Sequence, residues 1–325
     1  MVTMKRRREY IGKEIVMMKT AAWILMVVLV IGLVAIPGCG DGDSTTGSAE
    51  AGSITVGSKE FTEQLILGQM MILLLEEEGW DVDDKTGLGG TVIARTALES
   101  GDIDVYMEYT GTGLITYLGH EDAITDSQLC YDVVKQEDLQ QNGIVWLDRS
   151  LFDNTYTLMM RSAHAEVLGI DNISDLASHI NAANRLKFAS GAEFQGRDDG
   201  LPGVEMAYGF EFDDVTQMLD GLTYKALKDG DVDVAVGFAT TGLIAAYDLV
   251  NLEDDKHFFP VYNVAPTLKK PFLDEYPEVE NILNLVAPLL DTETMQALNN
   301  RVDSDKEEPS DVARDWLIEV GLIIN

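Results

Sequence analysis

ALESGDIDVYMEYTGTGLI (residues 97–115) aligns without a gap with ALKDGDVDVAVGFATTGLI (residues 226–244), and ten of the 19 positions are identical. Each copy has the order expected for the end of a helix, a glycine turn, a short strand and a Thr-Gly pair that opens another helix. The offset of about 130 residues is too long for the unit of a solenoid. The pair of repeats therefore predicts two similar lobes.

A second, weaker similarity precedes each repeat. Residues 54–61 form a predicted strand that passes through small residues into a helix, and residues 188–194 have the same pattern. Strands that alternate with helices predict α/β lobes with mostly parallel sheets and ligand groups at the strand ends. The helix after the first strand is predicted to end at Gly79 and to have one apolar face, formed by Leu67, Met70, Met71, Leu74 and Leu75.

Composition excludes one large class of partner. The 325 residues contain 23 Lys and Arg against 56 Asp and Glu, a formal net charge of -33. Nucleic-acid binding needs a basic surface, so no nucleic-acid partner is expected. Because 46% of the residues are hydrophobic, the chain has enough apolar side chains for a folded core, and the acidity indicates a solvated surface.

The first residues have the layout of an export signal. Residues 5–8 are basic, residues 21–36 are apolar, and Pro37-Gly38-Cys39 leads into a polar stretch. The sequence therefore predicts a signal peptide over residues 1–38. Residues 36–39 resemble the lipobox of exported lipoproteins, which implies a lipid on Cys39 and a polar linker over residues 39–52. An uncleaved single-span anchor is the alternative, and either would place the globular part outside the cytoplasm.

The sequence lacks the patterns of common catalytic and cofactor sites. It has no His-Glu-x-x-His or Cys-His zinc spacing, no complete dinucleotide-binding glycine pattern, no nucleophile elbow and no phosphate-binding loop. Cys130 has no neighbouring histidine and is predicted to be buried packing. The acid pairs Asp102/Asp104 and Asp231/Asp233 occupy equivalent repeat positions, as expected of turn and strand-entry residues. We therefore expect no enzyme activity, no cofactor and no metal.

Two cations follow equivalent strands of the two lobes. Lys59 comes after a strand and precedes a helix, so its ammonium and the helix N-terminus can hold an anion together. Arg197 can bind a carboxylate through two parallel hydrogen bonds. The alternative is that both are surface ion pairs with the abundant acids.

Aromatic residues stand near the same strand ends. Tyr109 and Phe238 share one repeat position and could face each other across a cleft, while Tyr156 and Tyr262 lie near the expected crossings between the lobes. A box of ring faces can hold a quaternary ammonium by cation–π attraction. Ordinary core packing is the alternative for each ring.

Three stretches, residues 57–64, 104–113 and 262–266, resemble the glycine betaine/choline substrate-binding proteins of osmoprotectant ABC transporters, over roughly residues 53–325. The resemblance implies a two-lobe type II periplasmic-binding-protein fold, with lobe one over residues 53–152 and 255–325 and lobe two over residues 153–254. It assigns the ligand carboxylate to Lys59, Thr112 and Arg197. It assigns the ammonium cage to Tyr109, Asn154, Tyr156, Phe238 and Tyr262, although the family commonly has tyrosine at the Phe238 position.

The expected function is that of an extracytoplasmic solute-binding protein of an ABC importer. It would capture glycine betaine, close around it as a monomer and deliver it to a membrane permease. The same fold could instead bind choline, carnitine, proline, a polyamine or another small solute. Two other classes remain open, namely an extracytoplasmic enzyme that uses Cys130 and a sensory lipoprotein.

Overall fold

The computed structural model describes residues 52–324. The expected signal peptide and Cys39 lie outside the described residues, as does the expected linker except for Gly52. Within residues 52–324, no helix combines the length and the apolar character that crossing a bilayer requires.

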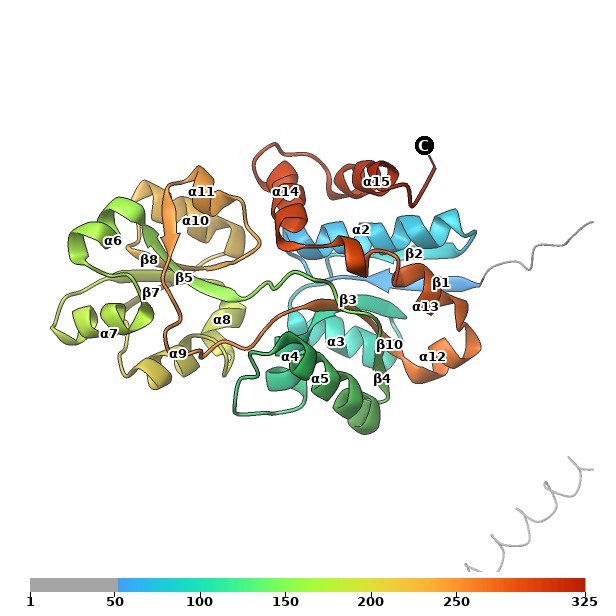
Figure 1. The fold of residues 1–325 in the computed structure, drawn as a ribbon, viewed down its shortest axis with the longest axis horizontal. Helices are drawn as coiled ribbons and strands as arrows, with labels where there is room; N and C mark the ends of the chain where they lie inside the picture. Colours follow the sequence, from blue (N-terminus) through green and yellow to red (C-terminus); the bar gives the residue numbers. More distant parts are fainter. Residues whose placement is uncertain (1–51, 325) are drawn as a thin grey trace, which may run out of the picture. The chain divides into compact units, whose positions relative to one another are not determined.

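Two five-stranded sheets form the framework of the described chain (Figure 1). The first sheet has the strand order β2-β1-β3-β10-β4. Its strands are β1 (Ser53–Gly57), β2 (Asp81–Lys85), β3 (Val105–Tyr109), β4 (Ile144–Trp146) and β10 (Val264–Lys269).

The second sheet repeats this order with other segments, as β7-β6-β8-β5-β9. Its strands are β5 (Tyr156–Arg161), β6 (Lys187–Ser190), β7 (Asp214–Gln217), β8 (Val234–Phe238) and β9 (Leu249–Asn251). In each sheet the fourth strand runs antiparallel to both of its neighbours, while the first three strands are parallel. Four strands of each sheet thus share one direction, as expected, but the antiparallel strand was not predicted.

Helices cover both faces of the first sheet. α2 (Thr62–Glu77) packs on one face together with the C-terminal helices α13 (Glu278–Leu283), α14 (Thr292–Asp303) and α15 (Pro309–Glu319). The opposite face carries α3 (Thr91–Ser100) and α5 (Ser127–Asn142) (Figure 1). Shorter elements complete this part of the chain: α4 (Thr110–Thr112), a π-helix (Gly113–Tyr117), α12 (Lys270–Glu275) and a 3₁₀ turn (Ala287–Leu289).

Six helices accompany the second sheet. They are α6 (Ser162–Leu168), α7 (Ile173–Asn181), α8 (Ala192–Gly196), α9 (Leu201–Tyr208), α10 (Asp220–Asp229) and α11 (Leu243–Ala246).

The sequence repeat corresponds to the same structural unit in both sheets. α3 and α10 each end at a glycine with positive φ, Gly101 (84°) and Gly230 (82°). An aspartate just before the next strand then contacts the neighbouring parallel strand. Asp104 accepts a hydrogen bond from the amide of Thr55 in β1, and Asp233 accepts one from the amide of Lys187 in β6. These two aspartates are therefore strand-entry residues, as predicted.

Helix α2 is buried more completely than its sequence pattern predicted. The five predicted apolar residues are buried, but Ile66, Ile72 and Leu73 on other faces are buried as well. The additional burial arises because α13, α14 and α15 cover the side of α2 that faces away from the sheet. The helix ends at Glu77, close to the predicted stop at Gly79.

Two helical glycines predict opposite effects on stability. A Cβ on Gly113 would lie 2.7 Å from Val134 and 2.8 Å from Trp146, whereas a Cβ on Gly221 would meet nothing within 4 Å. We expect Gly113→Ala to lower the free energy of unfolding by about 1–3 kcal/mol through overpacking. Gly221→Ala should raise it by up to about 1 kcal/mol because alanine favours the helix. Urea unfolding measures both, and equal effects would contradict this packing.

Candidate functional site

A cavity lies where the ends of β1 and β3 meet those of β6 and β8. All eight residues that the sequence singled out for ligand binding line it. The twelve lining residues are Lys59, Phe61, Tyr109, Thr112, Asn154, Tyr156, Glu193, Phe194, Arg197, Asp220, Phe238 and Tyr262.

Lys59 is buried beyond the end of β1, with 3% of its surface exposed. Its Nζ donates to Glu108 Oε1 at 2.7 Å and to Thr91 Oγ1 at 2.9 Å, at the first residue of α3. Glu108 also accepts hydrogen bonds from the hydroxyls of Tyr106 and Tyr117. The charge of the ammonium is thus balanced by Glu108 inside the protein, and the group is held beside the cavity.

Arg197 is held in a similar way from the other sheet. Its Nε and Nη2 donate to the two carboxylate oxygens of Asp199, at 2.7 and 2.5 Å, and Nη1 donates to Glu193 at 2.9 Å. Nη2 also lies 3.4 Å from Thr112 Oγ1. The Arg197–Asp199 pair and the Lys59–Glu108 pair are buried, and the Arg197–Glu193 pair is partly buried, so the alternative of surface ion pairs is wrong.

Glu193 joins the two parts of the site. Its carboxylate accepts hydrogen bonds from the amide and the hydroxyl of Thr91 as well as from Arg197. Burial alone would raise the pKa of Glu193, but the charges of Lys59 and Arg197 and the bonds from Thr91 lower it to about 2. Glu193 is therefore an anion throughout the physiological range.

The aromatic rings form one connected group. Tyr156 contacts Phe238 and Tyr262, with ring centroids 5.3 and 5.5 Å apart. Phe61 stacks on Phe238 at 5.6 Å and on Tyr109 at 6.2 Å. Tyr109 and Phe238 thus share a neighbour, Phe61, which stacks on both of them.

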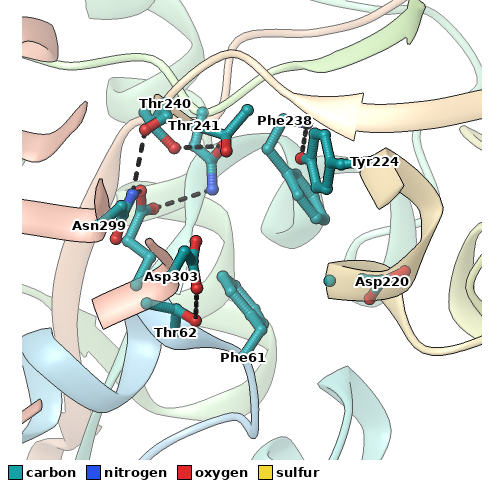
Figure 2. A pocket seen from close by; sticks show the side chains of 12 residues that line it. Phe61, Thr62, Asp220, Tyr224, Phe238, Thr240, Thr241, Asn299 and Asp303 are labelled. Atoms are coloured by element: carbon teal, nitrogen blue, oxygen red, sulfur yellow. Dashed lines mark hydrogen bonds between the residues drawn. The ribbon is translucent and has the colours of Figure 1, made fainter. Parts of the chain in front are cut away.

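A second cavity adjoins the first and shares Phe61, Asn154, Asp220 and Phe238 with it (Figure 2). Beside it lies Glu63, which is 2% exposed. Glu63 accepts hydrogen bonds from the side chains of Tyr109, Asn154 and Asn299. Burial raises the pKa of Glu63, although these hydrogen bonds oppose the rise.

Four lining residues were not among the predicted ligand-binding residues. Phe61 and Phe194 are the phenylalanines shared by the weaker similarity between residues 54–61 and 188–194. That similarity could therefore have indicated both residues. Glu193 precedes Phe194 in the same pattern. Asp220 begins α10 and belongs to no motif, so no sequence signal indicated it.

The described residues outside the cavity offer neither a reactive cysteine nor a metal site. Cys130 is fully buried, as predicted, and burial raises the pKa of its thiol to about 11, so it is not a reactive thiolate. Within residues 52–324, no group of three or more His, Cys, Asp or Glu side chains is arranged to hold a metal ion.

The partnership of Arg197 with Asp199 gives a prediction on stability. Asp199→Ala leaves a buried guanidinium without its bidentate partner, so the free energy of unfolding should fall by about 3–5 kcal/mol. Asp198→Ala removes the same charge from the exposed neighbouring position and should change it by about 0.5 kcal/mol or less. Denaturant titration of both variants measures the difference, and similar losses would show that the buried pair is not important.

Comparisons with known proteins agree with this architecture. A family described as the substrate binding domain of ABC-type glycine betaine transport systems matches residues 52–319. A glycine-betaine-binding protein of Pseudomonas aeruginosa is 41% identical over 285 residues, which cover 85% of this chain and 91% of that protein. The glycine betaine-binding protein YehZ of Escherichia coli is 33% identical, over 83% of this chain and 92% of its own length.

A solved structure described as a glycine betaine/carnitine/choline ABC transporter superimposes with a TM-score of 0.68 at 30% identity. The match covers 84% of this chain and 99% of the other. The two sheets with equivalent strand order, the cavity at their strand ends and these matches lead to one conclusion. The chain belongs to the family of substrate-binding domains of ABC-type glycine betaine transport systems.

Proposed function

We propose that this protein captures a small quaternary-ammonium solute, in the first place glycine betaine, outside the cytoplasm and delivers it to an ABC permease. The observation that carries the proposal is a single cavity with ring faces beside two buried cations. Glycine betaine is a zwitterion, and a dry cleft must replace the water at both of its ends.

The carboxylate end of the ligand would bind beside Lys59, Thr112 and Arg197. An ammonium has three N–H donors and a guanidinium has five. The contacts described above occupy two donors of Lys59 and four of Arg197, which leaves one on each cation. The hydroxyl of Thr112 can donate a third hydrogen bond while it accepts one from Arg197.

The trimethylammonium end would lie against the ring faces of Tyr109, Tyr156, Phe238 and Tyr262, with Asn154 at their edge. We add Phe61 to this cage because it stacks on both Tyr109 and Phe238. A quaternary ammonium donates no hydrogen bond, so ring faces stabilise it without leaving a donor unsatisfied. Each face contributes roughly 0.5–2 kcal/mol.

The cleft residues come from two proposed lobes, residues 53–152 with 255–325 and residues 153–254. A ligand that contacts both lobes binds the closed arrangement better than an open one and so shifts the population toward closure. The closed protein would then dock on the permease as a monomer. Ligand capture and closure by the described residues, as proposed, would use no cofactor and no metal.

The proposal includes attachment to the outer face of the membrane. Export by residues 1–38 and a lipid on Cys39 would leave residues 39–52 as a tether, and an uncleaved N-terminal helix is the alternative anchor. Mass spectrometry of the protein from membranes distinguishes a diacylglyceryl cysteine from an intact N-terminus.

Choline and carnitine are the main alternative ligands, and the solved structure at 30% identity is named for both of them as well as for glycine betaine. An intact cationic pair formed by Lys59 and Arg197 would favour a ligand that carries a carboxylate over choline. That argument is weaker now, since Glu108, Asp199 and Glu193 already pair with these cations.

An analogue whose head group is uncharged, and which keeps the carboxylate, tests the cage directly. The 3,3-dimethylbutanoate ion has the shape of glycine betaine with carbon in place of the charged nitrogen. Calorimetric titration should give binding of glycine betaine and a loss of at least about thirtyfold for the analogue, because several ring faces lose their cation. Equal affinities, or no binding of glycine betaine by the folded protein, would overturn the proposal.

A matched pair of variants tests which rings form the cage. Tyr156→Leu should weaken glycine betaine binding by roughly 3- to 30-fold through loss of one ring face. Tyr247→Leu removes a ring that packs against Lys228 outside the cavity and should leave binding unchanged. If the two variants bind equally well, Tyr156 is not part of the cage.

A further inference from the structure

Asp220 differs from the other charged residues that line the cavity. Lys59 pairs with Glu108, and Arg197 pairs with both Asp199 and Glu193. Within residues 52–324, Asp220 forms no ion pair with any Lys, Arg or His side chain. Its charge is therefore the one at the cavity wall that no protein cation balances.

The position of Asp220 is well defined. It is the first residue of α10 and is half-buried, and its carboxylate lies against Gly191. Gly191 leaves room for it, since a Cβ there would lie 1.9 Å from Asp220 Oδ1. Asp220 lines both adjoining cavities, and Figure 2 shows it across the rings of Phe61 and Phe238 from Asn299 and Thr240.

The surroundings of Asp220 are acidic. Burial and the nearby charges of Glu193 and Glu60 raise its pKa to about 6. Glu63 and Asp303, whose pKa values burial also raises, line the adjoining cavity. Near neutral pH, a cation in the cleft would thus meet a carboxylate whose nearest charged neighbours, Glu193 and Glu60, are acidic.

We propose that Asp220 is the counter-ion of the ligand's quaternary ammonium and shifts the selectivity of the cleft toward ligands with a net positive charge. Such a ligand, for example choline, neutralises Asp220 without adding a carboxylate. A zwitterion such as glycine betaine adds a negative charge close to Glu193 and Asp199. This inference rests on the proposed function, because it assumes that the cleft binds quaternary ammonium compounds.

The test compares two ligands in two variants. Asp220→Asn removes the charge with little change in shape, and Asp214→Asn removes the same charge from an exposed position on the edge strand β7. Calorimetry at pH 7.5 should show that Asp220→Asn weakens choline binding by about tenfold or more, and weakens glycine betaine binding several-fold less. Asp214→Asn should change both affinities by less than about twofold.

A pH series provides a readout that a structural role of Asp220 would not change. As the pH falls from 7.5 to 5.0, Asp220 takes up a proton, so choline should bind the unaltered protein more weakly. Bound choline favours the ionised carboxylate, so binding near pH 6 should release protons, and the heat should vary with the ionisation enthalpy of the buffer. The Asp220→Asn variant keeps Glu63, Glu193 and Asp303, and it should lose most of both effects.

The outcomes separate this inference from the proposed function. If the unaltered protein binds no quaternary ammonium compound, the proposed function fails and this inference fails with it. If it binds them, but Asp220→Asn keeps both the ratio of the two affinities and the release of protons, Asp220 is not the counter-ion and the proposed function stands.

Discussion

The removal of Lys59 and Arg197 from water is the constraint on which the rest of the site depends. A buried cation without a partner is strongly unfavourable, so each must meet carboxylates inside the protein. Glu108 forms an ion pair with Lys59, and both Asp199 and Glu193 form ion pairs with Arg197. These carboxylates are in turn held by hydroxyl groups, among them Tyr106 and Tyr117 on Glu108 and Tyr262 on Asp199. Much of the polar interior around the cavity thus balances the charges of these two cations and holds their side chains in place.

The same interactions connect the two sheets. Glu193 follows β6 but binds Thr91 at the start of α3, and Tyr262 precedes β10 but binds Asp199, which follows α8. The same contacts therefore balance the charges of the cations and hold the strand ends of the two sheets together. A solute that contacts these groups would contact residues of both sheets, which is the coupling that the proposed capture of a ligand needs.

Local sequence patterns predicted the paired α/β architecture because both copies of the repeat contain the same turn and strand-entry residues, such as Gly101 and Gly230. They also selected eight residues that the fold brings to one cavity. They missed the antiparallel strand of each sheet, because strand direction depends on where the chain crosses and not on the strand's own residues. They underestimated the burial of α2, because the helices that cover its outer side lie more than 200 residues later.

The local charge of the cleft illustrates a deeper limit of sequence patterns. A net charge of -33 says little about one cavity, and the presence of Lys59 and Arg197 suggested a positive one. Pairing reverses that conclusion, because every lining cation has a carboxylate partner while Asp220 has no cationic one in the part of the chain that the structure describes. No sequence motif indicates Asp220, because its importance depends on which lining charges remain without an ion-pair partner in the folded structure. The choice between a cationic and a zwitterionic solute is then set by the residual charge after pairing, and not by the number of basic residues near the site.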